Sequence, residues 1–283
     1  MEKAKGKSKK AKVKRAVLPS SLLPFTFLLL PFCLCALPVV AHAQANETQA
    51  TGVVRLRVRP KVNDKEKGLA RKRFYLIKGG LAENKELLEK INRQTIQTRE
   101  CYYRNIKASE AFINWLKEGD CESVYCRTVE EKYLTGASAV PEFQAAYERG
   151  AKEYKTPELG RLWLTTNLTD ELRDGFYRQK QAALKALISE AEIATKAPVL
   201  SVMTDRNGTA YFTDLTPGSY LVTNLLPVEF GDKTILWTTC EVKVKAGTEI
   251  PFLMSNSSYK NVKCVGIEKP LPACDANRQT ASN

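Results

Sequence analysis

The sequence predicts an α+β protein: an antiparallel β-sandwich that is split by a helical insertion and braced by disulfides. Short alternating or β-branched runs stand on both sides of a long segment in which apolar residues recur at spacings of three and four. Six cysteines lie outside the N-terminal leader. We expect a signal peptide at 1–45, sandwich strands at 46–80 and 198–264, the helical insertion at 81–197 and an irregular tail at 265–283.

The N-terminus has the organisation of a signal peptide. Residues 1–15 contain eight Lys/Arg and one Glu, and an uncharged apolar stretch follows from Ala16 to Ala41. Two overlapping small-x-small patterns, Ala41-His42-Ala43 and Ala43-Gln44-Ala45, predict cleavage there. We therefore expect an exported protein that is periplasmic, cell-surface or secreted. A membrane-anchored scaffold is the alternative if the leader is retained, because a bilayer span needs about 20 apolar residues.

Removal of the leader lowers the net charge of the protein and removes its only histidine. Of the formal net charge of +13, about +6 remains, which favours anionic lipid or polysaccharide surfaces. Nucleic-acid binding by the basic segment 55–73 is disfavoured, because its basic residues alternate with Val and Leu as in a half-exposed strand. The only histidine, His42, leaves with the leader, which excludes Ser-His-Asp and Cys-His catalysis and histidine-based zinc sites.

No catalytic, cofactor or metal residue is therefore predicted, since no dinucleotide or comparable cofactor motif is present. A hydrolase that uses two carboxylates, as glycosidases do, remains an alternative because it needs only a pair of Asp or Glu across a cleft. The sequence singles out no such pair.

The cysteine pattern agrees with export. The six disulfide candidates divide into two groups, one before residue 130 and one after 239: Cys101, Cys121, Cys126, Cys240, Cys264 and Cys274. An even number in an oxidising compartment predicts three disulfides. Complete pairing of two groups of three requires one or three bridges between them. We expect one bridge within each group and one across.

Strands are predicted where the apolar pattern has period two or is β-branched and aromatic. They are expected at 53–60, 72–80, 199–205, 209–215, 219–226, 234–245 and 249–255.

The middle segment is predicted to be helical. One apolar run extends from Leu88 to Leu116 and stops at Gly119-Asp120, and a second helix follows Pro141. Thr156-Pro157-Glu158 and Thr169-Asp170-Glu171 have the composition of helix starts. The long last helix is expected to bury one face, made of Leu172, Phe176, Leu184, Leu187 and Ala191. Trp115, Tyr154 and Trp163 are interpreted as core side chains, with a ligand groove as the alternative.

The stretch "TDRNGTAYFTDLTPGSYLV" at 204–222 is interpreted as a structural hairpin. Asp205 and Asn207 are expected to form the turn, with Gly208 relieving backbone strain, and Pro217-Gly218 to form a corner. A calcium loop made of Asp205, Asn207 and Asp214 is disfavoured, because a further early oxygen ligand and the bidentate Glu are missing.

This hairpin resembles the signature of carboxypeptidase regulatory-like and transthyretin-like (prealbumin-like) β-sandwich modules. The matching residues are Thr204, Asp205, Gly208, Phe212, Leu215, Pro217, Gly218 and Tyr220, and residues 67–76 resemble an upstream family segment. The resemblance covers about 52–80 and 198–254. It implies an accessory, assembly or binding module rather than an enzyme.

Related pilin-type domains form a Lys-Asn isopeptide bond with the help of a Glu. Here Asn224 stands where that Glu is expected, which disfavours self-crosslinking, although Glu229 lies nearby. We expect a non-catalytic binding or assembly module of the cell envelope, without a cofactor, whose partner is an envelope protein or polysaccharide.

Overall fold

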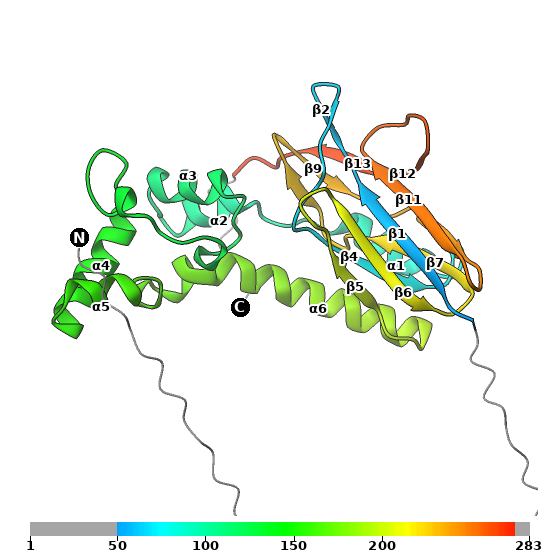
Figure 1. Ribbon diagram of the computed structural model, residues 1–283, viewed down its shortest axis with the longest axis horizontal. Helices are drawn as coiled ribbons and strands as arrows, with labels where there is room; N and C mark the ends of the chain where they lie inside the picture. Colours follow the sequence, from blue (N-terminus) through cyan, green and yellow to red (C-terminus); the bar gives the residue numbers. More distant parts are fainter. Residues whose placement is uncertain (1–49, 275–283) are drawn as a thin grey trace, which may run out of the picture. The chain divides into compact units, whose positions relative to one another are not determined.

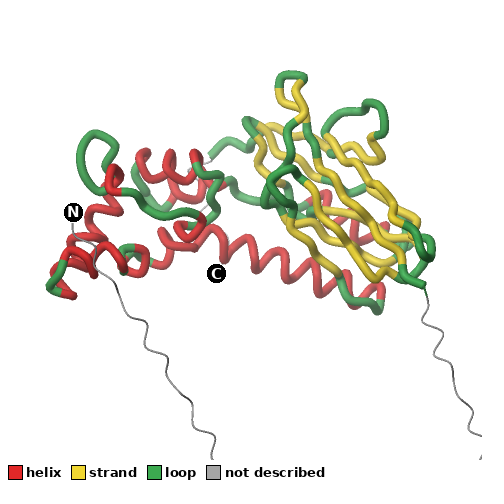
Figure 2. The backbone as a smooth tube through the Cα atoms, viewed as in Figure 1, coloured by secondary structure: helices red, strands yellow, loops and turns green. Residues whose placement is uncertain are grey.

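The computed structural model describes residues 50–274, so the expected signal peptide and the end of the tail lie outside the described residues. Strands occupy both ends of this range and helices its middle (Figures 1 and 2). The predicted α+β class is confirmed.

The first sheet has the strand order β12-β11-β1-β6. Its strands are β1 Gly52–Val58, β6 Thr209–Leu215, β11 Glu249–Ser255 and β12 Val262–Val265. In β1 the side chains alternate between buried and half-buried, as the period-two pattern predicts. The expectation of a wholly antiparallel sandwich was wrong for this sheet, because β1 pairs with β11 in parallel and β11 with β12 in parallel. A parallel pair needs a crossover connection, and the long chain between β1 and β11 provides one.

The second sheet is antiparallel and has the strand order β10-β7-β4-β5. Its strands are β4 Arg73–Lys78, β5 Leu200–Met203, β7 Gly218–Thr223 and β10 Cys240–Val244. Side chains from the facing sides of the two sheets form one core, which contains Val54 and Leu56 of β1 and Phe74 and Leu76 of β4. The two sheets therefore pack face to face.

The opposite face of the second sheet is covered by helices. Tyr75 and Ile77 of β4 and Leu221 of β7 pack with Leu88 of α1 (Lys85–Arg93) and Leu184 of α6 (Phe176–Thr195). This cover explains why four consecutive residues of β4 are buried, a pattern typical of strands that are enclosed on both faces. The helices α1 and α6 therefore form a second hydrophobic core with the outer face of this sheet.

Three of the remaining helices build a separate core: α2 Arg99–Asn105, α3 Glu110–Glu118 and α4 Pro141–Tyr154. The short helix α5 Pro157–Leu162 packs against α4. Figure 1 shows α6 extending from this helical group to the sheets, and four of the five residues predicted for its buried face are buried: Phe176, Leu184, Leu187 and Ala191. The fifth, Leu172, lies before α6 in the π-helical segment Glu171–Gly175 and is half-buried. The predicted helix start at Thr156 is confirmed, because its hydroxyl accepts a hydrogen bond from the Leu159 amide.

The single helical run expected from Leu88 to Leu116 was wrong, because the segment forms three helices. Thr98 and Ser109 each start a new helix by accepting a backbone hydrogen bond, from Cys101 and Phe112 respectively. An apolar spacing that continues across both breaks conceals them, whereas the capping residues mark them.

A third sheet has the order β13-β9-β8, with β8 Val228–Phe230, β9 Lys233–Leu236 and β13 Ile267–Pro270. The expectation of an irregular chain after 264 was wrong over β13, which pairs antiparallel with β9. The local sequence of β13 does not indicate that it pairs with β9, more than 30 positions earlier in the chain. A two-stranded hairpin, β2 Lys61–Val62 and β3 Lys65–Glu66, follows β1.

Three disulfides join the six described cysteines. Cys121–Cys126 lies in the first group, Cys240–Cys264 in the second, and Cys101–Cys274 joins the two groups. This pairing agrees with the expectation of one bridge within each group and one across. Three disulfides indicate an oxidising, extracytoplasmic environment.

Candidate functional site

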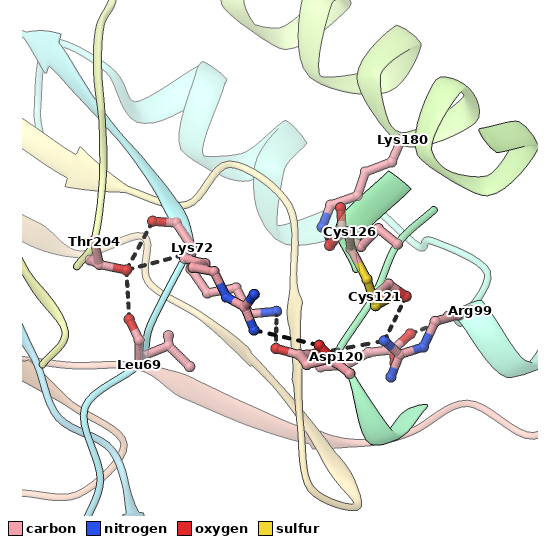
Figure 3. Close-up of polar contacts among 12 residues, drawn as sticks. Leu69, Lys72, Arg99, Asp120, Cys121, Cys126, Lys180 and Thr204 are labelled. Atoms are coloured by element: carbon pink, nitrogen blue, oxygen red, sulfur yellow. Dashed lines mark hydrogen bonds and ion pairs between the residues drawn. A yellow bond between two sulfur atoms is a disulfide. The ribbon is translucent and has the colours of Figure 1, made fainter. Parts of the chain in front are cut away.

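A cluster of six charged residues joins the helical group to the sheets. We call it the junction cluster, and its members are Lys72, Arg99, Asp120, Glu122, Lys180 and Glu229. Asp120 lies between two cations (Figure 3): its Oδ2 is 2.7 Å from the Lys72 Nζ and its Oδ1 is 3.6 Å from an Arg99 guanidinium nitrogen. The side chains of these two cations are only 10% and 9% exposed. The cluster therefore holds nearly buried positive charge at the junction.

The backbone of Lys72, just before β4, is held by Thr204, which follows β5. The Thr204 hydroxyl oxygen accepts a hydrogen bond from the Lys72 amide at 3.0 Å and donates one to the Leu69 carbonyl at 2.6 Å (Figure 3). Thr204 is itself buried. A threonine of the predicted hairpin motif therefore acts as a link between the ends of β4 and β5.

Arg99 is the first residue of α2, and hydrogen bonds from both its backbone amide and its side chain hold it in place. Its amide donates to the Glu229 Oε1 at 2.7 Å, and its guanidinium lies 3.4 Å from the Glu229 Oε2. The guanidinium also donates to the Cys121 carbonyl at 2.9 Å. Asp120 reaches Arg99 from a left-handed backbone conformation, with φ of 50°, directly after the end of α3.

The last pair of the junction cluster joins Lys180 of α6 to Glu122, at 2.5 Å between Nζ and Oε1. Altogether three cations face three carboxylates. The cavity that they line has a volume of about 30 Å³, which is space for about one water. The junction cluster therefore suits an internal ion-pair network and leaves no room for a sugar or a cofactor.

A larger groove adjoins the junction cluster and shares Ile96, Gln97 and Thr98 with its cavity. Its volume is about 510 Å³, within the range of small-ligand sites. It is lined by the connection between α1 and α2, by α2 itself, by β9 and by the chain from β13 to the Cys101–Cys274 disulfide. We call it the linker groove.

The linker groove has a mostly uncharged lining. Four side-chain amides or hydroxyls of the α1–α2 connection and Asn105 at the end of α2 supply donors and acceptors, and Ile106 and Leu236 supply apolar surface. Lys269 is the one charged side chain among the described lining residues. Burial raises the pKa of the Tyr102 phenol, and the Glu171 carboxylate raises it further, so this hydroxyl is neutral at physiological pH. The lining suits a neutral ligand with hydrogen-bonding groups.

The residues of the predicted hairpin turn form local hydrogen bonds. The Asp205 carboxylate accepts from the amides of Asn207 and Thr209, both at 2.8 Å. Gly208 has a positive φ of 74°, and a Cβ there would lie 2.3 Å from the Val58 carbonyl oxygen. Gly218 follows Pro217 at the corner, with φ of 152°. Among the described residues no group of three His, Cys, Asp or Glu is placed to hold a metal ion.

Asn224, which occupies the position expected for the isopeptide-promoting Glu, is buried and bonded to the backbone. Its side chain donates to the Ile235 carbonyl at 2.9 Å and accepts from the Trp237 amide at 2.9 Å. Both functions of the amide are thereby used to join the end of β7 to β9. Glu229 is likewise engaged, by Arg99.

The three aromatic residues considered for a groove do not act together. Trp115 is buried in the helical core against Phe143, with ring centroids 4.9 Å apart. Trp163 is 45% exposed, and Tyr154 is half-buried. Neither the junction cluster nor the linker groove contains any of them.

Sequence reasoning missed both the junction cluster and the linker groove. The cluster draws its members from segments more than 100 positions apart, and paired charges look like ordinary surface residues in a sequence. The groove depends on the extended connection 94–98, which the apolar spacing concealed. The Thr98 cap was the available indication of this break.

Comparison of the chain with protein-family models, with curated proteins and with solved structures finds no match. Within residues 50–274, no helix has the length and apolar character needed to cross a membrane.

Proposed function

We propose that the chain is an exported, non-catalytic binding or assembly module of the cell envelope, built on a prealbumin-like β-sandwich with a helical insertion. The linker groove is the binding site in this proposal. Its partner is an envelope protein segment or a polysaccharide that presents neutral hydrogen-bonding groups.

The observation that carries the proposal is the composition of the linker groove. Its volume of about 510 Å³ accommodates a ligand, and no Asp or Glu is among the described residues that line it. Amides such as those of Gln97 and Asn105 and hydroxyls such as that of Thr95 recognise neutral polar groups, and the apolar side chains between them exclude water. The Cys101–Cys274 disulfide holds one wall of the groove to α2.

A carboxylate-pair hydrolase has less support. Asp120 and Glu229 approach the same guanidinium, but both are ion-paired with it and their cavity is the size of one water. A glycosidase of either stereochemical type must hold the scissile bond of a sugar between its two carboxyl groups. If purified protein released reducing ends from envelope polysaccharide, and Asp120→Asn abolished the release, the non-catalytic proposal would be wrong.

Site-specific crosslinking in envelope fractions tests the groove. A photoreactive amino acid at Asn105, inside the linker groove, is compared with one at Glu148, on α4 and outside the groove. We expect a discrete adduct from position 105 alone, identified by mass spectrometry as an envelope protein or by periodate staining as a glycan. Equal adducts from both positions, or none from position 105, would contradict the proposal.

Export is tested separately by N-terminal sequencing of the protein purified from the envelope fraction. We expect the mature chain to begin at Gln44 or Asn46. Recovery of the chain with residues 1–40 attached would instead support the membrane-anchored scaffold.

A further inference from the structure

The outward face of the first sheet carries a row of three arginines. Val54, Leu56 and Val58 of β1 point into the core, so the alternation of the strand places Arg55 and Arg57 on the other side, and Arg59 continues the alternation directly after the strand. All three arginines are half-buried. We call these three residues the arginine row. Positions two apart on a strand are about 6.6 Å apart, so the row spans about 13 Å.

The positive charge of the arginine row is largely uncompensated. Arg55 lies 3.3 Å from Glu249 of β11. Neither Arg57 nor Arg59 has a carboxylate within ion-pair distance among the described residues. The helical group differs, because Glu100 there binds both Arg104 and Lys117. Like charges at neighbouring positions of one sheet face repel, so an external anion would stabilise the row.

The neighbours of the row on adjacent strands are apolar or hydroxylic. Pro251 and Tyr211 flank Arg55, and Leu253 and Thr209 flank Arg57. The Tyr211 ring is 50% exposed. On β12, Cys264 points into the core, so the exposed Lys263 beside it adds a further cation to the outward face. The described helices cover the outer face of the second sheet. Their hydrophobic cores contain no residue of the outward face of the first sheet.

We propose that the outward face of the first sheet binds an anionic polysaccharide. A row of cations at regular spacing along a strand matches a linear polymer with repeated negative charges, whereas a small anion would need a pocket. The exposed Tyr211 ring beside the row provides an apolar face on which a sugar ring can pack. This surface is distinct from the linker groove, and the inference does not rest on the function proposed for the groove.

Polysaccharide is favoured over two other polyanions. The disulfides indicate an extracytoplasmic environment, where nucleic acid is not the usual polyanion. Binding to an anionic bilayer is strengthened by several apolar side chains that enter the interface, whereas Tyr211 is the one strongly exposed large apolar side chain among the described direct neighbours of the row.

Binding to polygalacturonate tests the inference, with neutral dextran, a single-stranded 30-mer DNA and phosphatidylglycerol vesicles as comparisons. We expect the mature chain to bind polygalacturonate, with affinity that falls as salt rises, and not to bind dextran. Arg57→Gln/Arg59→Gln should weaken binding at least about tenfold, which corresponds to the loss of about 1.4 kcal/mol. The charge-conserving Arg57→Lys/Arg59→Lys variant should retain most of the affinity and shows whether the sheet tolerates substitution.

The matched control is Arg161→Gln/Arg178→Gln, which removes the same charge from residues of the helical segment that are ion-paired. We expect this control to bind almost as wild type. The inference is overturned if both double variants lose the same affinity, if the row variant binds normally, or if dextran binds as well as polygalacturonate. Tighter binding of DNA or vesicles would also overturn it, by assigning the face to another partner.

Discussion

Lys72 and Asp120 stand 48 positions apart, and their side chains meet in a hydrogen-bonded ion pair of 2.7 Å between Nζ and Oδ2. The pair ties the strand β4 to the chain that follows α3. Because Asp120 also approaches Arg99, one half-exposed carboxylate contacts two nearly buried cations, of which Arg99 has Glu229 as a second partner. The stability of the junction is therefore expected to depend on Asp120 more than on an ordinary surface carboxylate.

Asp120→Ala should destabilise the protein by about 1–2 kcal/mol, because it leaves two desolvated cations with fewer partners. Lys72→Met removes one of these cations, so the double variant should cost less than the sum of the single variants by about 0.5–1.5 kcal/mol. Chemical denaturation of the four proteins measures this coupling. Glu148→Ala on α4 is the control and should change stability little; strict additivity of the two substitutions would contradict the prediction.

Comparison of alanine substitutions at two glycines with positive φ separates the cost of backbone strain from the cost of a steric clash. Gly208→Ala should cost at least about 3 kcal/mol, because the left-handed conformation is strained and the new Cβ would lie 2.3 Å from the Val58 carbonyl oxygen. Gly231 has a similar φ of 65°, but a Cβ added there would have no atom within 4 Å. Gly231→Ala should therefore lower the free energy of unfolding by only about 1 kcal/mol. Thermal and urea unfolding compare the two variants. Equal losses would show that the turn at Gly208 moves without cost.

The three disulfides should differ in their contribution to stability. They span sequence separations of 173, 24 and 5 residues for Cys101–Cys274, Cys240–Cys264 and Cys121–Cys126. Loop-closure entropy predicts losses of about 5, 3 and 2 kcal/mol when each pair is replaced by serine. Guanidinium unfolding of the three double variants checks the order. If the Cys121/Cys126 variant were the least stable, local packing rather than chain entropy would govern.

Stability should depend on pH through Glu268. Hydrogen bonds from Lys233 and Asn256 hold the pKa of this carboxyl below its usual value near 4.5. A lowered folded-state pKa contributes stability that is present above about pH 4.5 and is lost as the pH falls through the folded pKa. Glu268→Gln should therefore be less stable than wild type at pH 7, by about 0.5–1 kcal/mol.

At about pH 3 the difference between Glu268→Gln and wild type should shrink, because this pH lies below the usual carboxyl pKa near 4.5, so the unfolded chain is already largely protonated and the lowered folded-state pKa contributes less stability. Urea unfolding at both pH values measures the difference. Glu148→Gln serves as the control, because this residue is exposed on α4. A difference for Glu268→Gln that is unchanged between the two pH values would contradict the assignment.

Local patterns in the sequence predicted much of the fold. The alternation in β1, the capped start of α5 and the buried face of α6 all follow from side-chain periodicity or from a residue beside its own backbone, and the structure contains each of them. The division of the cysteines into two groups of three indicated that at least one disulfide joins the groups, and the structure contains one such disulfide. These features depend on residues that are near one another in the chain, so the sequence is sufficient to specify them.

The tertiary structure alone decided the parallel pairing of β1 with β11, the strand β13 and the cover of the second sheet by α1 and α6. The same holds for the junction cluster and the linker groove. Each depends on which distant segments meet, and that choice minimises exposed apolar surface and unpaired charge over the whole chain rather than within a window of residues. Lys72 and Asp120 illustrate the limit: in the sequence they are two ordinary charges, and only the fold makes them partners.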